Sequence, residues 1–128
     1  MMNNGVIDLI IRIKNGYQAH RETITTPSSR FKVEVLKKLE ALGYIDSYEQ
    51  VDNINYITIN LKYTKGTPAL TGVKLYSKPG RRWYVAFKDL KPVLSGIGYS
   101  LLSTPKGVLT NKEARKEKVG GELLFDLW

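Results

Sequence analysis

The sequence predicts an α+β fold in two parts: an N-terminal α-β-α-β-β domain over residues 1–66, and a β-rich C-terminal domain with one short helix over residues 67–128. In the first part, apolar residues recur at helical spacing in two segments and alternate with polar residues in others. Alternation dominates after Thr64-Lys65-Gly66-Thr67-Pro68, a run with the composition of a linker. A length of 128 residues suits one or two small domains with modest cores.

The first helix is predicted from an apolar stripe near the N-terminus, with Asn3 or Asn4 as its cap. The stripe consists of Val6, Ile10, Ile13 and Tyr17. A short β-prone segment follows at residues 23–26, and Pro27 ends it because proline cannot donate a ladder hydrogen bond.

Ser28 or Ser29 is expected to cap the second helix, and Gly43 is expected to end it. The buried face of this helix consists of Phe31, Val35, Leu39 and Leu42. Two strands and a turn follow, at residues 44–51, Asp52-Asn53 and residues 54–63. We expect the two helices to cover one face of the resulting small sheet.

The second part is predicted to begin with a strand at residues 73–75 and a type II turn from Lys78 to Arg81. Pro79 and Gly80 occupy the two central positions of that turn. Alternation over residues 83–87 predicts another strand and places Trp83 in the core. A connector and a further strand follow, at residues 89–98 and 99–104.

The C-terminal segment carries the most local signals. A short strand at Val108-Leu109 leads into a helix whose start, Thr110 to Glu113, fits a capping box. We expect the helix to stop near Gly120. Gly120-Gly121 is expected to adopt positive φ and to let another chain come close. Alternation over residues 123–128 predicts a closing strand.

Charge is divided unevenly between the two parts. The net charge is +8, and residues 67–128 hold eleven Lys or Arg against five Asp or Glu. Residues 1–66 hold nine and seven. An excess of this size points to nucleic acid or to an anionic membrane surface. The electrostatic footprint is therefore expected mainly on the second part.

The first candidate site is the segment Ser103-Thr104-Pro105-Lys106-Gly107. Hydroxyls, backbone N–H groups and Lys106 can bind an anion, and small hydroxyl residues can enter the shallow minor groove of an RNA helix. The segment lacks the glycine and lysine spacing of a nucleotide-binding P-loop. The same residue types fit a plain turn at the end of a strand equally well.

A second candidate is the basic turn that precedes Tyr84. Lys78, Arg81 and Arg82 can meet phosphates, and Tyr84 can stack on a base or ribose. The alternative is a solvated hairpin tip. The first part has a weaker basic surface, for which a solvated helix face is the alternative. Its residues are Arg12, Lys14, Asn15, Ser28, Ser29, Arg30 and Lys32.

Catalytic and metal-binding patterns are poor. There is one histidine, His20, there is no cysteine, and no His, Asp or Glu cluster has metal-ligand spacing. An enzyme using Ser103 with Lys106 is one rival interpretation, although Ser103 has no obvious base. A basic protein-interaction or membrane-surface module is the other. No stretch approaches about 20 apolar residues, and the first apolar run lacks the basic start of a signal peptide.

Three ordered blocks of the chain have a recognisable composition and spacing. They are Ile7-Asp8 with Arg12-Ile13-Lys14-Asn15 and Pro27-Ser28-Ser29-Arg30; Ser77-Lys78-Pro79-Gly80-Arg81-Arg82-Trp83-Tyr84; and Ser103 to Thr110 with Glu113-Ala114-Arg115 and Gly120-Gly121-Glu122-Leu123. Together they resemble the family of small-subunit ribosomal protein eight, of bacterial or organellar type. The resemblance covers essentially the whole chain.

The resemblance implies a two-domain α+β protein that binds small-subunit ribosomal RNA, helps to assemble its central domain and remains as a structural component. It implies neighbouring small-subunit ribosomal proteins as partners and, in some members, the protein's own messenger RNA. It implies no enzyme activity, cofactor, small-molecule substrate or membrane. The implied location is the ribosome, in the cytoplasm or alternatively in a mitochondrion or plastid.

The family's central contact is a Ser-Thr-Ser loop, of which Ser103 and Thr104 carry over. Pro105 stands at the third position, which removes one hydroxyl and one N–H but fixes φ and can stiffen the loop. The implied loop supports are Pro105, Gly120, Gly121 and Glu122. The implied RNA-binding residues are Ser103, Thr104, Lys106, Gly107, Tyr84, Lys78, Arg81, Arg82, Arg12, Asn15, Ser28, Ser29 and Arg30.

Overall fold

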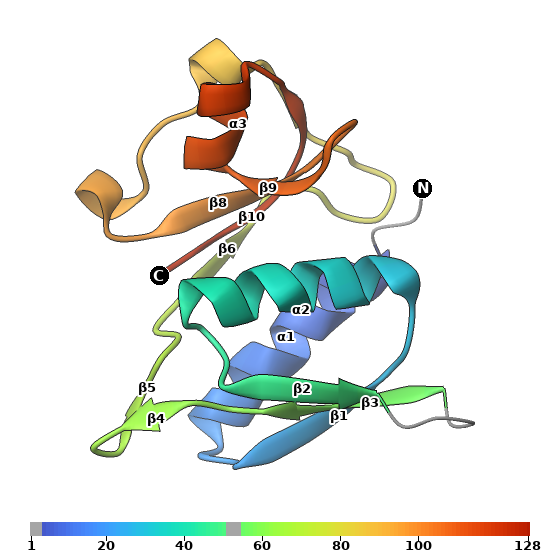
Figure 1. The fold of residues 1–128 in the computed structure, drawn as a ribbon, viewed down its shortest axis with the longest axis vertical. Coiled ribbons are helices and arrows are strands. Elements are labelled where there is room, and N and C mark those ends of the chain that lie inside the picture. The colour runs from blue at the N-terminus through green and yellow to red at the C-terminus, as the bar shows by residue number, and fades with distance from the viewer. Residues whose placement is uncertain (1–3, 51–54) are drawn as a thin grey trace. The chain divides into compact units, whose positions relative to one another are not determined.

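A computed structural model describes residues 4–50 and 55–128 of the chain (Figure 1). Two sequence predictions lie outside this description, the turn at Asp52-Asn53 and the cap at Asn3; Asn4, the alternative cap, is the first residue of α1. The chain divides into two compact units: Asp8–Thr71, and Gly72–Trp128 together with the start of the chain as far as Ile7. The predicted α+β class is confirmed. Whether residues 1–66 and 67–128 are separate domains stays a prediction.

The first unit is a small antiparallel sheet covered on one side by α2 (Arg30–Leu42) and by α1 (Asn4–Gln18) from Asp8 onward (Figure 1). Its strand order is β1-β3-β2. The strands are Thr23–Pro27 (β1), Ser47–Gln50 (β2) and Tyr56–Asn60 (β3). The predicted apolar stripe of α1 is buried, and the core is completed by Val35, Leu36, Leu39, Ile57 and Ile59.

Local signals placed the ends of α2 correctly. The side chain of Ser29 accepts a hydrogen bond from the Lys32 N–H at 3.2 Å, and Gly43 closes the helix with φ +85°. The predicted strand over residues 54–63 was too long. It ends at Asn60 because Tyr63–Thr64 (β4) pairs instead with Thr67–Pro68 (β5) in a small hairpin, where the sequence suggested a plain linker.

The second unit is built around its last strand, Gly121–Leu127 (β10), which pairs with three others. The sheet order is β6-β10-β8-β9, and β7 also pairs with β10. The other strands are Val73–Leu75 (β6), Tyr84–Val85 (β7), Tyr99–Thr104 (β8) and Gly107–Thr110 (β9). Helix α3 (Asn111–Glu117) packs onto a core of Leu90, Leu102, Ala114 and Leu123.

The capping box of α3 is confirmed, but its C-terminal end differs from the prediction. Thr110 accepts from the Glu113 N–H at 3.1 Å, and the Glu113 carboxylate accepts from the Thr110 N–H at 2.9 Å. The helix stops at Glu117, and Lys118 takes the left-handed position with φ +57°. Its N–H reaches the carbonyls of Ala114 and Arg115, so no glycine is needed there.

Trp83 is not in the core, contrary to the prediction, and is 45% exposed. The predicted strand over residues 83–87 contracts to β7, and the 3₁₀ turns Phe87–Asp89 (η1) and Leu94–Gly96 (η2) follow it. Val85 and Phe87 do pack against the core of this unit. Trp83 instead lies edge-to-face with Tyr76, with ring centroids 5.6 Å apart.

Candidate nucleic-acid interface

The turn between β8 and β9 is closed by the hydroxyl of Thr104. The Thr104 Oγ1 donates to the carbonyl of Gly107 at 2.8 Å and accepts from the Lys106 N–H at 3.1 Å. Thr104 also pairs with Gly107 across the two strands. This hydroxyl therefore stabilises the turn, and its hydrogen-bond donor and one of its acceptor positions are already used within the protein.

Pro105 fits the turn that the structure adopts. It occupies the first central position, and Lys106 at the second is not among the residues with positive φ, as a type I turn requires. Gly107 follows with φ +105°, as in hairpins that end a type I turn with a residue of positive φ. Proline is favoured at that first position because its fixed φ matches the turn.

Ser103 lies at the base of the same turn with an uncommitted hydroxyl. Its backbone pairs with Val108 on β9 and with Glu122 on β10. Its side chain is half-buried, and no hydrogen bond to its Oγ is found within residues 4–50 and 55–128. Of the two predicted hydroxyls, that of Ser103 is the one with full donor and acceptor capacity for a ligand.

Gly120 and Gly121 act by allowing close approach, and neither has the positive φ that the sequence suggested. A Cβ on Gly121 would collide with the carbonyl oxygen of Ser103, and one on Gly120 with the carbonyl oxygen of Val85. A carbonyl cannot move aside without breaking the strand pairing it belongs to. The glycine pair therefore lets β7 and the end of β8 sit tightly against β10.

These residues line a shallow, open hollow, the Ser103 hollow, with a volume of about 470 Å³. Glu122 pairs with Ser103 on one side and with Tyr84 on the other, so the three side chains share one face of the sheet. Tyr84 is 70% exposed. The hollow is lined by Tyr84, Val85, Ala86, Ser103, Thr104, Pro105, Gly120, Gly121 and Glu122.

Glu122 is buried beneath this hollow and carries a charge that is matched locally. Its carboxylate Oε2 lies 3.8 Å from the Nη1 of Arg82. Arg82, predicted to meet phosphate, therefore supports the β7–β10 pairing through this ion pair. Such a buried pair fixes geometry more than it adds stability, because desolvation offsets the Coulomb attraction.

The remaining predicted cations of this unit differ in whether their side chains have partners within the protein. Lys78 and Arg81 flank the predicted turn, in which Gly80 has φ +76° and the Arg81 N–H donates to the Lys78 carbonyl at 2.9 Å. Both are exposed. Lys106 binds the Glu117 carboxylate at 3.1 Å. On α3, Arg115 donates to the Leu90 carbonyl at 2.8 Å, which ties the helix to the connector.

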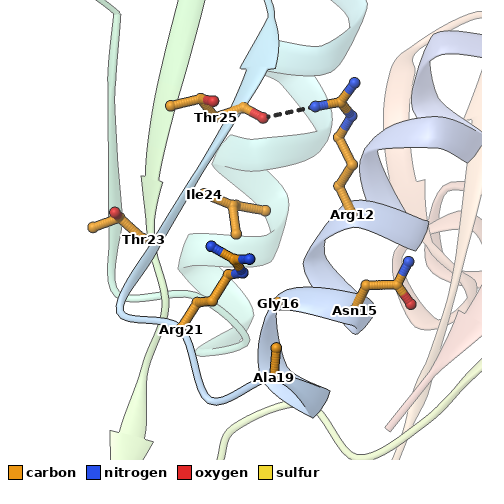
Figure 2. A pocket seen from close by; sticks show the side chains of 8 residues that line it. All are labelled: Arg12, Asn15, Gly16, Ala19, Arg21, Thr23, Ile24 and Thr25. Atoms are coloured by element: carbon orange, nitrogen blue, oxygen red, sulfur yellow. Dashed lines mark hydrogen bonds between the residues drawn. The ribbon is translucent and has the colours of Figure 1, made fainter.

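The first unit holds the weaker predicted surface, and the structure splits it between two places. Arg12 and Asn15 line a hollow of about 470 Å³ between α1 and β1 (Figure 2). The guanidinium of Arg12 donates to the Thr25 carbonyl at 3.1 Å and to the Asp8 carboxylate at 2.8 Å.

Three more of the predicted residues, Ser28, Ser29 and Arg30, lie at the start of α2. Ser28 accepts from the Gln50 side chain at 2.7 Å, and Ser29 caps the helix. Arg30 follows, and it is exposed. Two of these three side chains therefore have structural partners.

Two supporting residues were not predicted as such. Ser77 is fully buried, donates to the Leu123 carbonyl at 2.8 Å and accepts from the Trp83 N–H at 3.0 Å. Lys32, predicted to lie on the basic surface, is instead buried, and it donates to the Thr26 hydroxyl at 3.0 Å and the Pro27 carbonyl at 2.8 Å.

Burial lowers the pKa of Lys32, while the nearby Asp8 carboxylate acts in the opposite direction. Helical spacing from Val35, Leu36 and Leu39 puts Lys32 on the buried face, so this burial could have been predicted. No comparable pattern marks Ser77.

The structure brings no catalytic pair together in this region. Lys106, the rival base for Ser103, binds Glu117. Within residues 4–50 and 55–128, no group of three His, Cys, Asp or Glu side chains is placed to hold a metal ion. Among the helices of the described residues, none is both long and apolar enough to cross a membrane.

Comparison with known proteins identifies the family. The family described as ribosomal protein S8 matches residues 4–128. The chain belongs to this family. It is 45% identical to small ribosomal subunit protein uS8 of Cereibacter sphaeroides (strain KD131), over 96% of this chain and 97% of that protein. It is 41% identical to the protein of the same name from Thermus aquaticus, over the full length of both. The Caulobacter vibrioides protein is 44% identical over 96% of each chain.

Proposed function

We propose that this chain is a structural constituent of the small ribosomal subunit and binds small-subunit ribosomal RNA through the Ser103 hollow. Relatives that match it along nearly their whole length are named small ribosomal subunit proteins. Most of the excess positive charge lies in the part of the chain that carries the hollow. Neighbouring ribosomal proteins are its further partners, and the ribosome in the cytoplasm is its location.

The observation that carries the proposal is the pairing of Glu122 with both Ser103 and Tyr84. It sets an uncommitted hydroxyl and an exposed aromatic ring on one face of one sheet. A small hydroxyl can reach the 2′-OH and base edges of an irregular RNA helix, and a tyrosine ring can stack on an unstacked base or a ribose. The exposed Lys78 and Arg81 add attraction for phosphate.

Binding to the protein's own messenger RNA is a finer form of the same proposal. It requires no second surface, because any RNA that presents the same helix geometry would fill the Ser103 hollow. The test is competition: a messenger segment and the ribosomal RNA helix should displace each other, and Ser103→Ala should weaken both.

The main experiment identifies the RNA and then removes one hydroxyl. RNA crosslinked to the purified protein is sequenced, and affinity is measured for the recovered small-subunit RNA helix. Ser103→Ala should weaken binding by about 1–3 kcal/mol, since its RNA partner loses a hydrogen bond inside a contact. The unfolding free energy should change little, because Ser103 Oγ has no partner in the described structure.

Two further variants sharpen that result. Thr104→Val should weaken RNA binding and also lower the melting temperature, because it removes both hydrogen bonds of the turn. Ser95→Ala, an exposed serine on η2, is the matched control and should change neither quantity. Wild-type RNA affinity in Ser103→Ala would remove this hollow from the interface.

A further inference from the structure

Trp83 is an exposed aromatic residue on an unusually rigid support. Its N–H donates to the Oγ of the buried Ser77 at 3.0 Å, and its carbonyl accepts from the Leu123 N–H at 2.8 Å. Yet 45% of the residue remains exposed. Both bonds fix the backbone of Trp83, and its ring packs edge-to-face on Tyr76. A ring on a fixed backbone position loses less conformational freedom when a ligand covers it, which favours binding.

The surroundings of Trp83 form a second hollow, the Trp83 hollow, of about 210 Å³. This volume lies below the roughly 300–1,000 Å³ of pockets for drug-sized ligands, so it suits a single ring system. Trp83 meets Tyr76 edge-to-face at 5.6 Å, and Lys74 Nζ lies 5.1 Å from the Tyr76 ring centroid. The lining is Lys74, Leu75, Tyr76, Lys78, Arg81 and Trp83.

Two chemical features of this hollow point to one ligand class. Three of its six lining residues are cations and none is acidic. The indole N–H of Trp83 has no hydrogen-bond partner in the part of the chain that the structure describes, so a donor is available beside the ring. The Asp126 carboxylate behind Tyr76 is already bonded to the Tyr76 hydroxyl, at 3.0 Å.

The two hollows are separate. Trp83 lines this one and its neighbour Tyr84 lines the Ser103 hollow, and the two linings share no residue. Successive residues of an extended chain point to opposite sides, which explains the division. Filling the Ser103 hollow therefore does not require filling the Trp83 hollow.

We propose that the Trp83 hollow binds one unpaired nucleotide of a single-stranded RNA segment, with its base stacked on Trp83 and its flanking phosphates at Lys74, Lys78 and Arg81. Aromatic rings that alternate with cations match the alternation of base and phosphate along a single strand. An acidic peptide would meet the cations but would offer the rings nothing comparable. The proposal rests on the proposed RNA-binding function and extends it to a second contact.

The test uses the full chain and 5′-phosphorylated hexa-adenylate RNA. Stacking should quench tryptophan emission in the wild type, and the anisotropy of labelled RNA gives the affinity. Trp83→Leu should weaken binding on the order of tenfold, the usual effect of removing one stacking ring. Tyr56→Leu, an exposed aromatic residue on β3 with no assigned role in RNA binding, is the matched control and should bind hexa-adenylate like the wild type.

A second variant guards against misfolding of Trp83→Leu. Lys78→Ala with Arg81→Ala changes two exposed side chains, keeps the ring, and should also weaken hexa-adenylate binding. Equal affinity of Trp83→Leu and wild type would overturn the proposal. So would equal quenching by hexaglutamate, which has charge without bases, or equally tight binding of AMP, which would point to a free nucleotide.

The outcomes separate this inference from the proposed function. If Ser103→Ala weakens binding of the ribosomal RNA helix while Trp83→Leu binds hexa-adenylate as tightly as the wild type, the proposal for the Trp83 hollow fails and the proposed function stands. If hexa-adenylate binding depends on Trp83 while Ser103→Ala has no effect on the helix, the Ser103 hollow fails and the Trp83 hollow stands.

Discussion

At the scale of single residues, one buried hydroxyl ties together three segments of the first unit. The Tyr17 hydroxyl on α1 donates to the Tyr44 carbonyl at 2.6 Å and accepts from the Lys62 N–H at 3.0 Å. Tyr44 follows α2 and Lys62 follows β3, so this one hydroxyl links α1 to the segment after α2 and to the segment after β3. Burial raises the pKa of Tyr17 above its usual value.

Tyr17→Phe should lower the unfolding free energy by about 1–3 kcal/mol at pH 7, because two backbone groups lose a buried partner. A raised folded-state pKa means that this contribution is complete below the unfolded-state pKa of about 10 and is lost as pH rises through the folded-state value. Urea unfolding at pH 7 and above pH 10 should therefore show the gap between wild type and variant narrowing.

Tyr63→Phe is the matched control for that experiment. Its hydroxyl donates to the Arg21 carbonyl at 2.7 Å, but this bond is exposed to water. Its loss should cost less than that of Tyr17, since water replaces the missing donor. Equal losses in the two variants would show that burial of the Tyr17 hydroxyl is not what matters.

The sequence predicts which residues form the candidate site, but not the structural role of each one. The sequence singled out Ser103, Thr104 and Tyr84, and the structure brings them to one hollow. The residue types alone do not predict that the Thr104 hydroxyl bonds within the turn while the Ser103 hydroxyl has no hydrogen-bond partner there. That difference depends on where the Gly107 carbonyl and the Lys106 N–H point. Alternation placed Trp83 inside, although hydrogen bonds to Ser77 and Leu123 hold it outside.

At the scale of elements, the sequence correctly predicts those helix ends that are set by neighbouring residues. It does not predict the ends that depend on a distant pairing partner or on an unusual backbone conformation. The Ser29 cap, the Gly43 stop and the capping box at Thr110 each depend on residues within one turn of helix. The end of β3 depends on β5, which competes for the following residues. The end of α3 depends on Lys118 accepting a left-handed conformation that glycine would adopt more easily.

Gly121→Ala tests whether β10 must pass close to β8. Its Cβ would meet the Ser103 carbonyl, so the strands must separate, and we expect a loss of roughly 1–3 kcal/mol in unfolding free energy. RNA affinity should fall as well, since the Ser103 carbonyl shifts with the turn. Both effects can be measured on one preparation, by urea unfolding and by RNA titration.

Gly80→Ala separates crowding from backbone conformation. Gly80 has φ +76° and open space around its Cα, so alanine there should cost only the strain of positive φ, roughly 1 kcal/mol. A smaller loss for Gly121→Ala than for Gly80→Ala would contradict the close-approach argument.

At the scale of the whole molecule, net charge overstates the number of cations available to RNA. In the second unit, Arg82 and Lys106 pair with Glu122 and Glu117, and Arg115 binds the Leu90 carbonyl. Seven cationic side chains of this unit form no hydrogen bond or ion pair with the described residues and are exposed. They are Lys74, Lys78, Arg81, Lys88, Lys91, Lys116 and Lys118.

If about five phosphates are neutralised, the logarithm of RNA affinity should fall with the logarithm of salt concentration at a slope of roughly −4. Removing Lys78 and Arg81 together should reduce the slope by about 1–2, because each lost phosphate contact removes slightly less than one unit. Ser103→Ala offers the contrast: it should shift the line to weaker affinity and leave its slope unchanged, since a neutral hydroxyl releases no counterion. A salt titration in which Ser103→Ala flattened the slope, or the double variant did not, would reverse the roles assigned to hydroxyl and cations.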